Sequence, residues 1–195
     1  MKIKGHNMKN IIIGGTVRSG KSTLANKIAK KFNYSLCESD TIVNAFDEVF
    51  PELGIVHNKP ESAREKYKPF LFEILNGFYR SLKYLEIVTI FPGAQFLPRH
   101  IAEYPKLDKY IVIFLGINDC TPEELVKKFR KWDKPSDWTF KESDEKLLKH
   151  AEKIINESIK LEIECKKYGF YYFNTFHDRE KTFDEVLKLI ETLQN

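Results

Sequence analysis

The sequence has few cysteines and no long hydrophobic run. Its three cysteines, Cys37, Cys120 and Cys165, show no CxxC or Cys/His spacing, which argues against a disulfide framework and a zinc site. No apolar stretch approaches the roughly 20 residues that span a membrane, and the opening MKIKGHN has no apolar segment typical of a secretory signal. We therefore expect a cytoplasmic protein without a membrane segment. Residues 1–7 are interpreted as an N-terminal extension or an expression remnant.

The sequence also has little excess charge. The net charge is +4, and 31% of the residues are charged, with both signs mixed along the chain. A nucleic-acid binder typically gathers its basic residues in a dense patch, and none is visible here. A nucleic-acid partner is therefore not expected, whereas an anionic small molecule is compatible with the mild positive charge. The 195 residues suit one domain, which we place at residues 8–195.

Five short runs are apolar throughout and do not alternate with polar residues. They cover residues 10–13, 34–37, 87–91, 110–115 and 170–173. Such runs are typical of parallel strands that are covered on both faces, and the segments between them have room for crossover helices. The sequence therefore predicts an α/β fold with a doubly wound, five-stranded parallel sheet.

Two helices have clear boundary signals. Thr121 followed by Pro and two Glu residues predicts a capped helix over residues 122–132. A second helix is expected from about Ser143 to Gly169, with Gly169 as its left-handed cap. We expect the core side of this helix to consist of its apolar stripe: Leu147, Leu148, Ala151, Ile154, Ile155, Ile159 and Ile163. The polar segment 133–140 between the two helices is interpreted as a loop that closes over a ligand.

The most specific feature is a phosphate-binding motif. Residues 15–22 satisfy G-x-x-x-x-G-K-[ST] and lie between an expected strand and an expected helix. In such a loop the backbone N–H groups and the helix N-terminus hold phosphate, the lysine reaches the outer phosphates, and the serine hydroxyl faces Mg²⁺. The sequence therefore predicts ATP or GTP binding with Ser22 as the metal ligand. The nucleotide-binding residues would be Gly15, Thr16, Val17, Arg18, Ser19, Gly20, Lys21, Ser22 and Thr23.

Asp40 is the candidate catalytic carboxylate. It follows the second expected strand, and in open parallel sheets ligands bind beyond the carboxyl ends of the strands. There it could accept the proton of an acceptor hydroxyl or orient the acceptor. It could equally be the N-cap of a helix that begins near Thr41.

The phosphate loop, the acidic residue after strand two, the Gly-containing turn after strand three and the late loop between two helices together resemble the small P-loop kinases with an adenylate-kinase-like core. The resemblance covers nearly the whole chain from Met8. It implies a strand order of 2-3-1-4-5, ATP with Mg²⁺ as donor, and a small-molecule phosphate acceptor covered by residues 41–85. It also implies a lid over residues 127–141 and direct transfer, in which Lys21, Mg²⁺ and a lid arginine or lysine neutralise the charge of the phosphoryl group. Together with Asp40, these are the expected catalytic groups.

The lid and acceptor sides offer several basic residues. Arg130 is the candidate lid arginine, although a solvated basic helix face would look the same. Arg64 and Arg99 are candidates for contacting an acceptor phosphate, and Gly93 lies in the turn after strand three. A homodimer remains open.

The sequence departs from the resemblance at the end of strand three. This family usually has an acidic residue just before the glycine there, whereas this chain has Phe91, Pro92 and Gly93. The metal would then depend on Ser22, the phosphates, water and either Asp40 or Glu38. Three functions follow: a small-molecule kinase, an ATP-binding regulator with little transferase activity, and, less favoured by charge, a kinase of nucleic-acid ends.

Overall fold

A five-stranded parallel sheet forms the centre of the protein. The computed structural model describes residues 8–56 and 60–194. The strands are β1 (Asn10–Gly15), β2 (Ser35–Leu36), β3 (Thr89–Pro92), β4 (Tyr110–Gly116) and β5 (Tyr171–Asn174), all parallel and in the order β2-β3-β1-β4-β5. Both the five strands and their order are as expected from the sequence. Individual strand ends differ by one or two residues, and β2 has only two residues.

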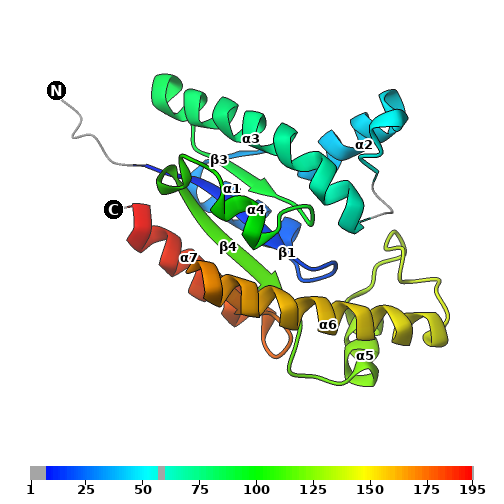
Figure 1. Cartoon of the computed structure of the whole chain (residues 1–195). Helices are drawn as coiled ribbons and strands as arrows, with labels where there is room; N and C mark the ends of the chain where they lie inside the picture. Colours follow the sequence, from blue (N-terminus) through cyan, green and yellow to red (C-terminus); the bar gives the residue numbers. More distant parts are fainter. Residues whose placement is uncertain (1–7, 57–59, 195) are drawn as a thin grey trace.

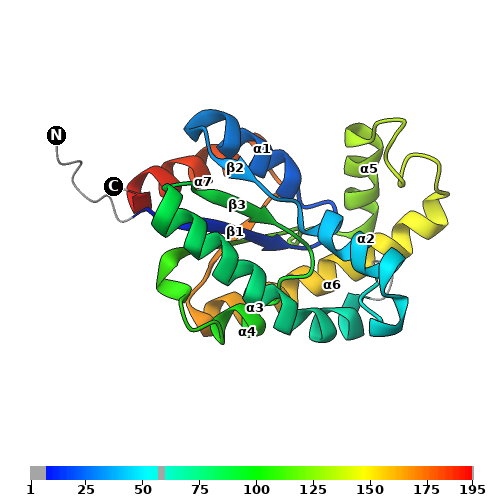
Figure 2. The ribbon, with the colours of Figure 1, turned by 90° about the horizontal axis from the view of Figure 1, so that it is seen from above.

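Helices cover both faces of this sheet (Figures 1 and 2). One face packs against α1 (Lys21–Phe32) and α7 (Arg179–Gln194); the other packs against α3 (Pro60–Leu85), α4 (Pro98–Ala102) and α6 (Asp144–Tyr168). Successive residues of the central strands point to opposite faces of the sheet and pack into different clusters. Ile11 and Ile13 join the α1/α7 side, while Ile12 joins the α3/α4/α6 side. This explains why the strands are apolar throughout.

The remaining elements flank the carboxyl ends of the strands or connect the others. They are α2 (Ser39–Val49), α5 (Pro122–Trp132) and the short 3-10 helices η1 (Pro51–Leu53) and η2 (Leu107–Lys109). α5 has the predicted bounds and a complete capping box between Thr121 and Glu124. None of the described helices is long and apolar enough to cross a membrane.

The predicted ends of α6 are confirmed, but its predicted stripe is partly wrong. Gly169 ends the helix with a φ of 73°. Ile159 and Ile163 are 44% and 62% exposed, whereas Ser158, Leu161 and Cys165 are buried. The predicted stripe steps by four residues from Ile155 to Ile159 and again to Ile163. Each such step turns about 40° beyond a full helical turn, so two in a row move the side chain off the core face. Alternating steps of three and four residues keep side chains on that face.

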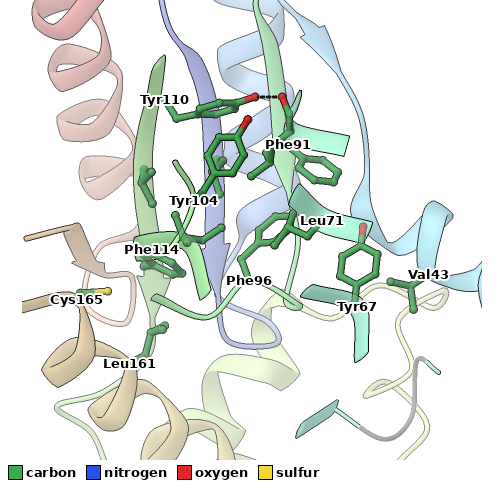
Figure 3. Packing of buried hydrophobic residues seen from close by; sticks show 14 of the residues in the cluster. Val43, Tyr67, Leu71, Phe91, Phe96, Tyr104, Tyr110, Phe114, Leu161 and Cys165 are labelled. Carbon is green, nitrogen blue, oxygen red and sulfur yellow. Dashed lines mark hydrogen bonds between the residues drawn. The ribbon is translucent and has the colours of Figure 1, made fainter. Parts of the chain in front are cut away.

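The core on the α3 side is rich in aromatic side chains (Figure 3). The Phe91 and Phe96 rings lie 4.8 Å apart, and the Tyr110 hydroxyl donates to the carbonyl oxygen of Leu75. Tyr67 of α3 and Val43 of α2 lie at the edge of this cluster. Most aromatic residues of segment 41–85, which we expected to cover the acceptor, therefore pack in or against this core.

The two ends of the described chain are joined by side-chain bonds. The Gln194 amide accepts a hydrogen bond from the Lys9 backbone N–H at 2.9 Å and donates to the Lys9 carbonyl at 2.8 Å. Figure 1 places this junction at the end of the molecule opposite the loop between α5 and α6. Residues 1–7, interpreted above as an extension, lie outside the described residues.

Candidate active site

The phosphate loop is held in shape by its own residues and by the sheet. Gly15 has a φ of 141°, and a Cβ on it would lie 2.1 Å from the Leu115 carbonyl oxygen, so no side chain fits there. Gly20 has a φ of 92° and caps α1. The Lys21 ammonium donates to the carbonyl oxygen of Thr16 at 2.6 Å. These contacts within the loop and to the sheet fix its shape.

Ser158 of α6 links the phosphate loop to the segment after β4 by hydrogen bonds. Its hydroxyl lies 3.0 Å from the Thr16 hydroxyl and accepts a hydrogen bond from the Ile117 backbone N–H at 2.8 Å. Both Ser158 and Thr16 are buried. Sequence reasoning missed this contact because the two residues are 142 positions apart.

Charged groups gather around Lys21. Burial lowers the pKa of the Lys21 ammonium to about 8; the carboxylates of Asp40 and Glu38 oppose this shift, and the Arg64 guanidinium adds to it. A lysine with a lowered pKa among two carboxylates and an arginine is typical of a functional site. Lys21, Asp40 and Arg64 thus lie near enough for their charges to act on one another.

Glu38, which follows β2, supplies an acidic group beside Ser22, although the end of β3 has none. The Ser22 hydroxyl donates to Glu38 Oε2 at 3.3 Å, and burial raises the pKa of this carboxyl group. β3 ends at Pro92 without a carboxylate, so the acidic group beside Ser22 comes from the end of β2. Of the two acidic residues considered for this role, Glu38 is the one bonded to Ser22.

Asp40 lies in the first turn of α2, and the N-cap of that helix is Glu38. The interpretation of Asp40 as an N-cap is therefore wrong, because the helix begins at Ser39, before the expected Thr41. Asp40 is exposed, and its Oδ1 accepts a hydrogen bond from Gln95 Nε2 at 2.9 Å. Gln95 Oε1 in turn accepts from the Ser39 hydroxyl at 2.7 Å. The sequence analysis did not identify Gln95, because no pattern near it in the sequence indicates its contact with Asp40, 55 residues away.

The candidate Gly93 is packed tightly against α2. A Cβ at this position would lie 2.5 Å from the Ser39 hydroxyl oxygen and 2.9 Å from Gln95 Oε1. Glycine therefore lets the turn after β3 approach the start of α2 and positions Gln95 beside Asp40.

The candidate Arg130 is engaged within the lid loop, by which we mean residues 133–143. Its guanidinium donates to the carbonyl oxygens of Thr139, Phe140 and Glu142 and to the carboxylate of Asp144. In this arrangement Arg130 ties the lid loop to α5 and α6. The candidate Arg99 pairs with Glu65 at 3.0 Å and Glu164 at 3.2 Å.

Arg18 joins the phosphate loop to the lid loop. It has a φ of 66°, and its guanidinium pairs with the carboxylate of Asp133 and, at 3.2 Å, with that of Asp137. The Asp133 side chain is only 1% exposed and also accepts from the Thr139 hydroxyl at 2.6 Å. The cation in this contact comes from the phosphate loop, and the acidic groups come from the lid.

Aromatic and basic side chains of α5, α7 and the loop after β5 gather beside Arg18 of the phosphate loop. The Arg179 guanidinium lies 3.7 Å from the centre of the Trp132 ring and donates to the Arg18 carbonyl oxygen at 3.0 Å. Burial is the main cause that lowers the Arg179 pKa to about 10. The Lys128 ammonium lies over the Trp132 and Phe176 rings. These groups surround the loop after β5.

Two cavities open in front of the phosphate loop and share the side chains of Arg64, Ala94, Lys153 and Glu157. The polar cavity, about 610 Å³, is further lined by Gly15, Thr16, Ser62, Phe96, Leu97, Arg99, Lys160, Leu161 and Glu164. The apolar cavity, about 540 Å³, is further lined by Val17, Val43, Ile55, Val56, Ala63, Tyr67, Gln95, Trp138, His150 and Ile154. Both fall in the range of small-molecule sites.

Comparison with known proteins points to one type of enzyme. The chain is 26% identical over 147 residues to a shikimate kinase of Clostridium botulinum (strain Langeland), covering 75% of this chain and 79% of that protein. No family model matches. The chain is a small P-loop kinase of the adenylate-kinase-like type. Like this relative, it is a small-molecule phosphotransferase.

Solved structures agree on the fold of the kinase. A shikimate kinase from Bacteroides thetaiotaomicron superposes with a TM-score of 0.58 at 18% identity, covering 94% of this chain and 99% of that one. A gluconokinase from Sinorhizobium meliloti 1021 gives a TM-score of 0.59 at 13% identity, covering 95% and 93%. These similarities leave the acceptor of this kinase open.

Proposed function

We propose that this kinase transfers the terminal phosphoryl group of ATP, with Mg²⁺, to a hydroxyl group of a small molecule held between α2, α3 and α6. The observation that carries the proposal is the proximity of Lys21 in the phosphate loop to the Asp40 and Glu38 carboxylates. Two neighbours connect these groups to the cavities: Arg64, whose charge also acts on Lys21, lines both cavities, and Gln95, which is bonded to Asp40, lines the apolar one. Phosphoryl transfer requires little more than such positioning and charge stabilisation.

On the donor side, the backbone N–H groups of residues 15–20 and the Lys21 ammonium would hold the phosphates. The Ser22 hydroxyl and the Glu38 carboxylate fit Mg²⁺, which prefers oxygen ligands and keeps part of its water shell. The metal would neutralise charge on the phosphates. The nucleotide base would lie near Trp132, Lys128 and residues 175–179.

On the acceptor side, Asp40 accepts the proton of the attacking hydroxyl and Gln95 orients the carboxylate. The new bond forms between the hydroxyl oxygen and the phosphorus as the bond to ADP breaks. Arg64, close to Lys21, stabilises the transferring group. Arg99 is proposed to contact acceptor charge in the polar cavity, whereas Arg130 is proposed to be a positioning residue for the lid.

The regulatory alternative was motivated by the missing carboxylate on β3. Glu38 beside Ser22 removes much of this motivation, because it supplies an acidic group to the same place. The relatives named above are described as kinases and give no support to a regulator.

The test is ADP production from ATP and Mg²⁺ with a panel of hydroxyl acceptors. We expect one acceptor class to raise ADP formation, Lys21→Ala to abolish it, and Asp40→Asn to lower kcat by about 10²- to 10⁴-fold. Glu38→Gln should raise the Mg²⁺ concentration needed for half-maximal rate, while the exposed Glu48→Gln on α2 serves as control. Full activity of Asp40→Asn would contradict the proposed role of that carboxylate.

A further inference from the structure

The apolar cavity has a wall that cannot satisfy a polyhydroxylated ligand. Seven of its lining side chains carry no hydrogen-bonding group: Val17, Val43, Ile55, Val56, Ala63, Ala94 and Ile154. A hydroxyl group pressed against such a wall loses its water without gaining a partner, which disfavours binding. A sugar or sugar acid, with hydroxyl groups around its whole ring or chain, is therefore a poor occupant.

Two aromatic side chains complete this wall. Tyr67 is buried beside Val43 at the edge of the core (Figure 3), and its hydroxyl oxygen makes no hydrogen bond within the described part of the chain. Trp138 of the lid loop is 48% exposed and makes an edge-to-face contact with His150 at 5.0 Å. The Trp138 ring thus offers contact area to a flat apolar group, and Tyr67 adds one hydrogen-bonding group.

Four polar side chains connect the apolar cavity to the proposed transfer site. Arg64, Lys153 and Glu157 also line the polar cavity, which Gly15 and Thr16 of the phosphate loop border, and Gln95 is bonded to Asp40. An occupant therefore meets apolar side chains over much of its body and charged groups at the end where phosphoryl transfer is proposed. The acceptor should combine these two characters in one molecule.

We propose that the acceptor is an alcohol attached to a flat aromatic ring system, with the ring in the apolar cavity against Trp138 and Tyr67 and the hydroxyl group toward Asp40. Nucleosides and hydroxymethyl-substituted aromatic rings share this chemistry. The placement of the hydroxyl group rests on the proposed function; the affinity for the ring rests on the cavity alone.

The experiment is calorimetric titration of the Mg·ADP-loaded protein with three ligand sets: the common nucleosides, hydroxymethyl-pyridines and hydroxymethyl-benzenes, and the polyols gluconate and shikimate. Ring-bearing alcohols should bind at least about tenfold more tightly than the polyols. Trp138→Ala should weaken that binding about tenfold, a loss typical of a stacked aromatic contact. Preference for nucleosides over the simple rings, or the reverse, distinguishes the two sources.

Phe140→Ala provides a matched control, because Phe140 is in the same loop, is 45% exposed and does not line the cavity. The inference is overturned if polyols bind as well as ring-bearing alcohols, if no ring-bearing alcohol binds, or if Trp138→Ala and Phe140→Ala behave alike. An ADP assay on the same ligands separates the two proposals. Binding of ring-bearing alcohols without ADP formation refutes only the kinase mechanism, whereas ADP formation with polyols alone refutes only the inference.

Discussion

Replacing Arg18 by glycine removes the cation that joins the phosphate loop to the lid loop. Glycine suits this position, since Arg18 has a φ of 66°, which a side chain disfavours. The change leaves the Asp133 carboxylate, 1% exposed, with the Thr139 hydroxyl as its remaining hydrogen-bond donor among the interactions described above. The lid can restore water to Asp133 by opening.

The size of the effect follows from these contacts. An uncompensated buried charge costs about 3–5 kcal/mol. The closed lid should therefore lose about 3–5 kcal/mol relative to the open lid. Since about 1.4 kcal/mol corresponds to a factor of ten, lid opening should become about 150- to 4000-fold more favourable.

Hydrogen exchange within the lid loop tests this. The backbone N–H groups of Phe140 and Glu142 are bonded to the Asp137 and Thr139 carbonyls of the same loop at 3.0 and 3.2 Å, so they exchange faster if the loop loosens once Arg18 no longer holds it. Asp137→Asn is the control, because an ion pair at a 28% exposed carboxylate contributes about 0–1 kcal/mol. Equal exchange rates in the Arg18→Gly and Asp137→Asn variants would refute the reasoning.

Three further predictions concern other parts of the molecule. Lys21 has a pKa of about 8, and a bound phosphate should raise it. ADP affinity measured by calorimetry should therefore be nearly full at pH 7, about half at pH 8 and about tenfold lower at pH 9; an equally steep fall in Lys21→Arg would contradict this. Ser158→Ala leaves the buried Ile117 N–H unpaired and should lower the free energy of unfolding by about 1–3 kcal/mol in urea, so an unchanged midpoint would refute it. Ile163→Lys should change stability by at most about 0.5 kcal/mol, because Ile163 is 62% exposed, whereas Ile154→Lys at a 4% exposed site should prevent stable folding; equal losses would contradict the corrected helix face.

Much of the fold could be predicted because its signals are local. The phosphate motif, the apolar runs and the capping box around Thr121 each lie within a few consecutive residues, and neighbouring side chains decide the local structure. Strand order came from the resemblance, because nothing within one strand specifies its neighbours. The end of α6 followed from Gly169, but its buried face depended on which elements it meets, and the choice of Ile159 and Ile163 was wrong.

The candidate site could be predicted only in part because its contacts join distant residues. Lys21 and Asp40 were proposed from motif and position, whereas Gln95 reaches Asp40 from 55 residues away. Arg18 reaches Asp133 from 115 residues away, and neither residue has a local pattern that reveals the pair. The hydroxyl-to-carboxylate bond between Ser22 and Glu38 likewise depends on how α1 and β2 are placed.

The bonds between Gln194 and Lys9 have a practical consequence for handling this protein. They hold both described ends at the same extremity, away from the lid loop and the two cavities (Figure 1). A surface tether or a dye attached beyond either end would leave the phosphate loop open to solvent. The two ends could also be linked and the chain reopened in an exposed loop elsewhere, which would yield a circular permutant with the same sheet.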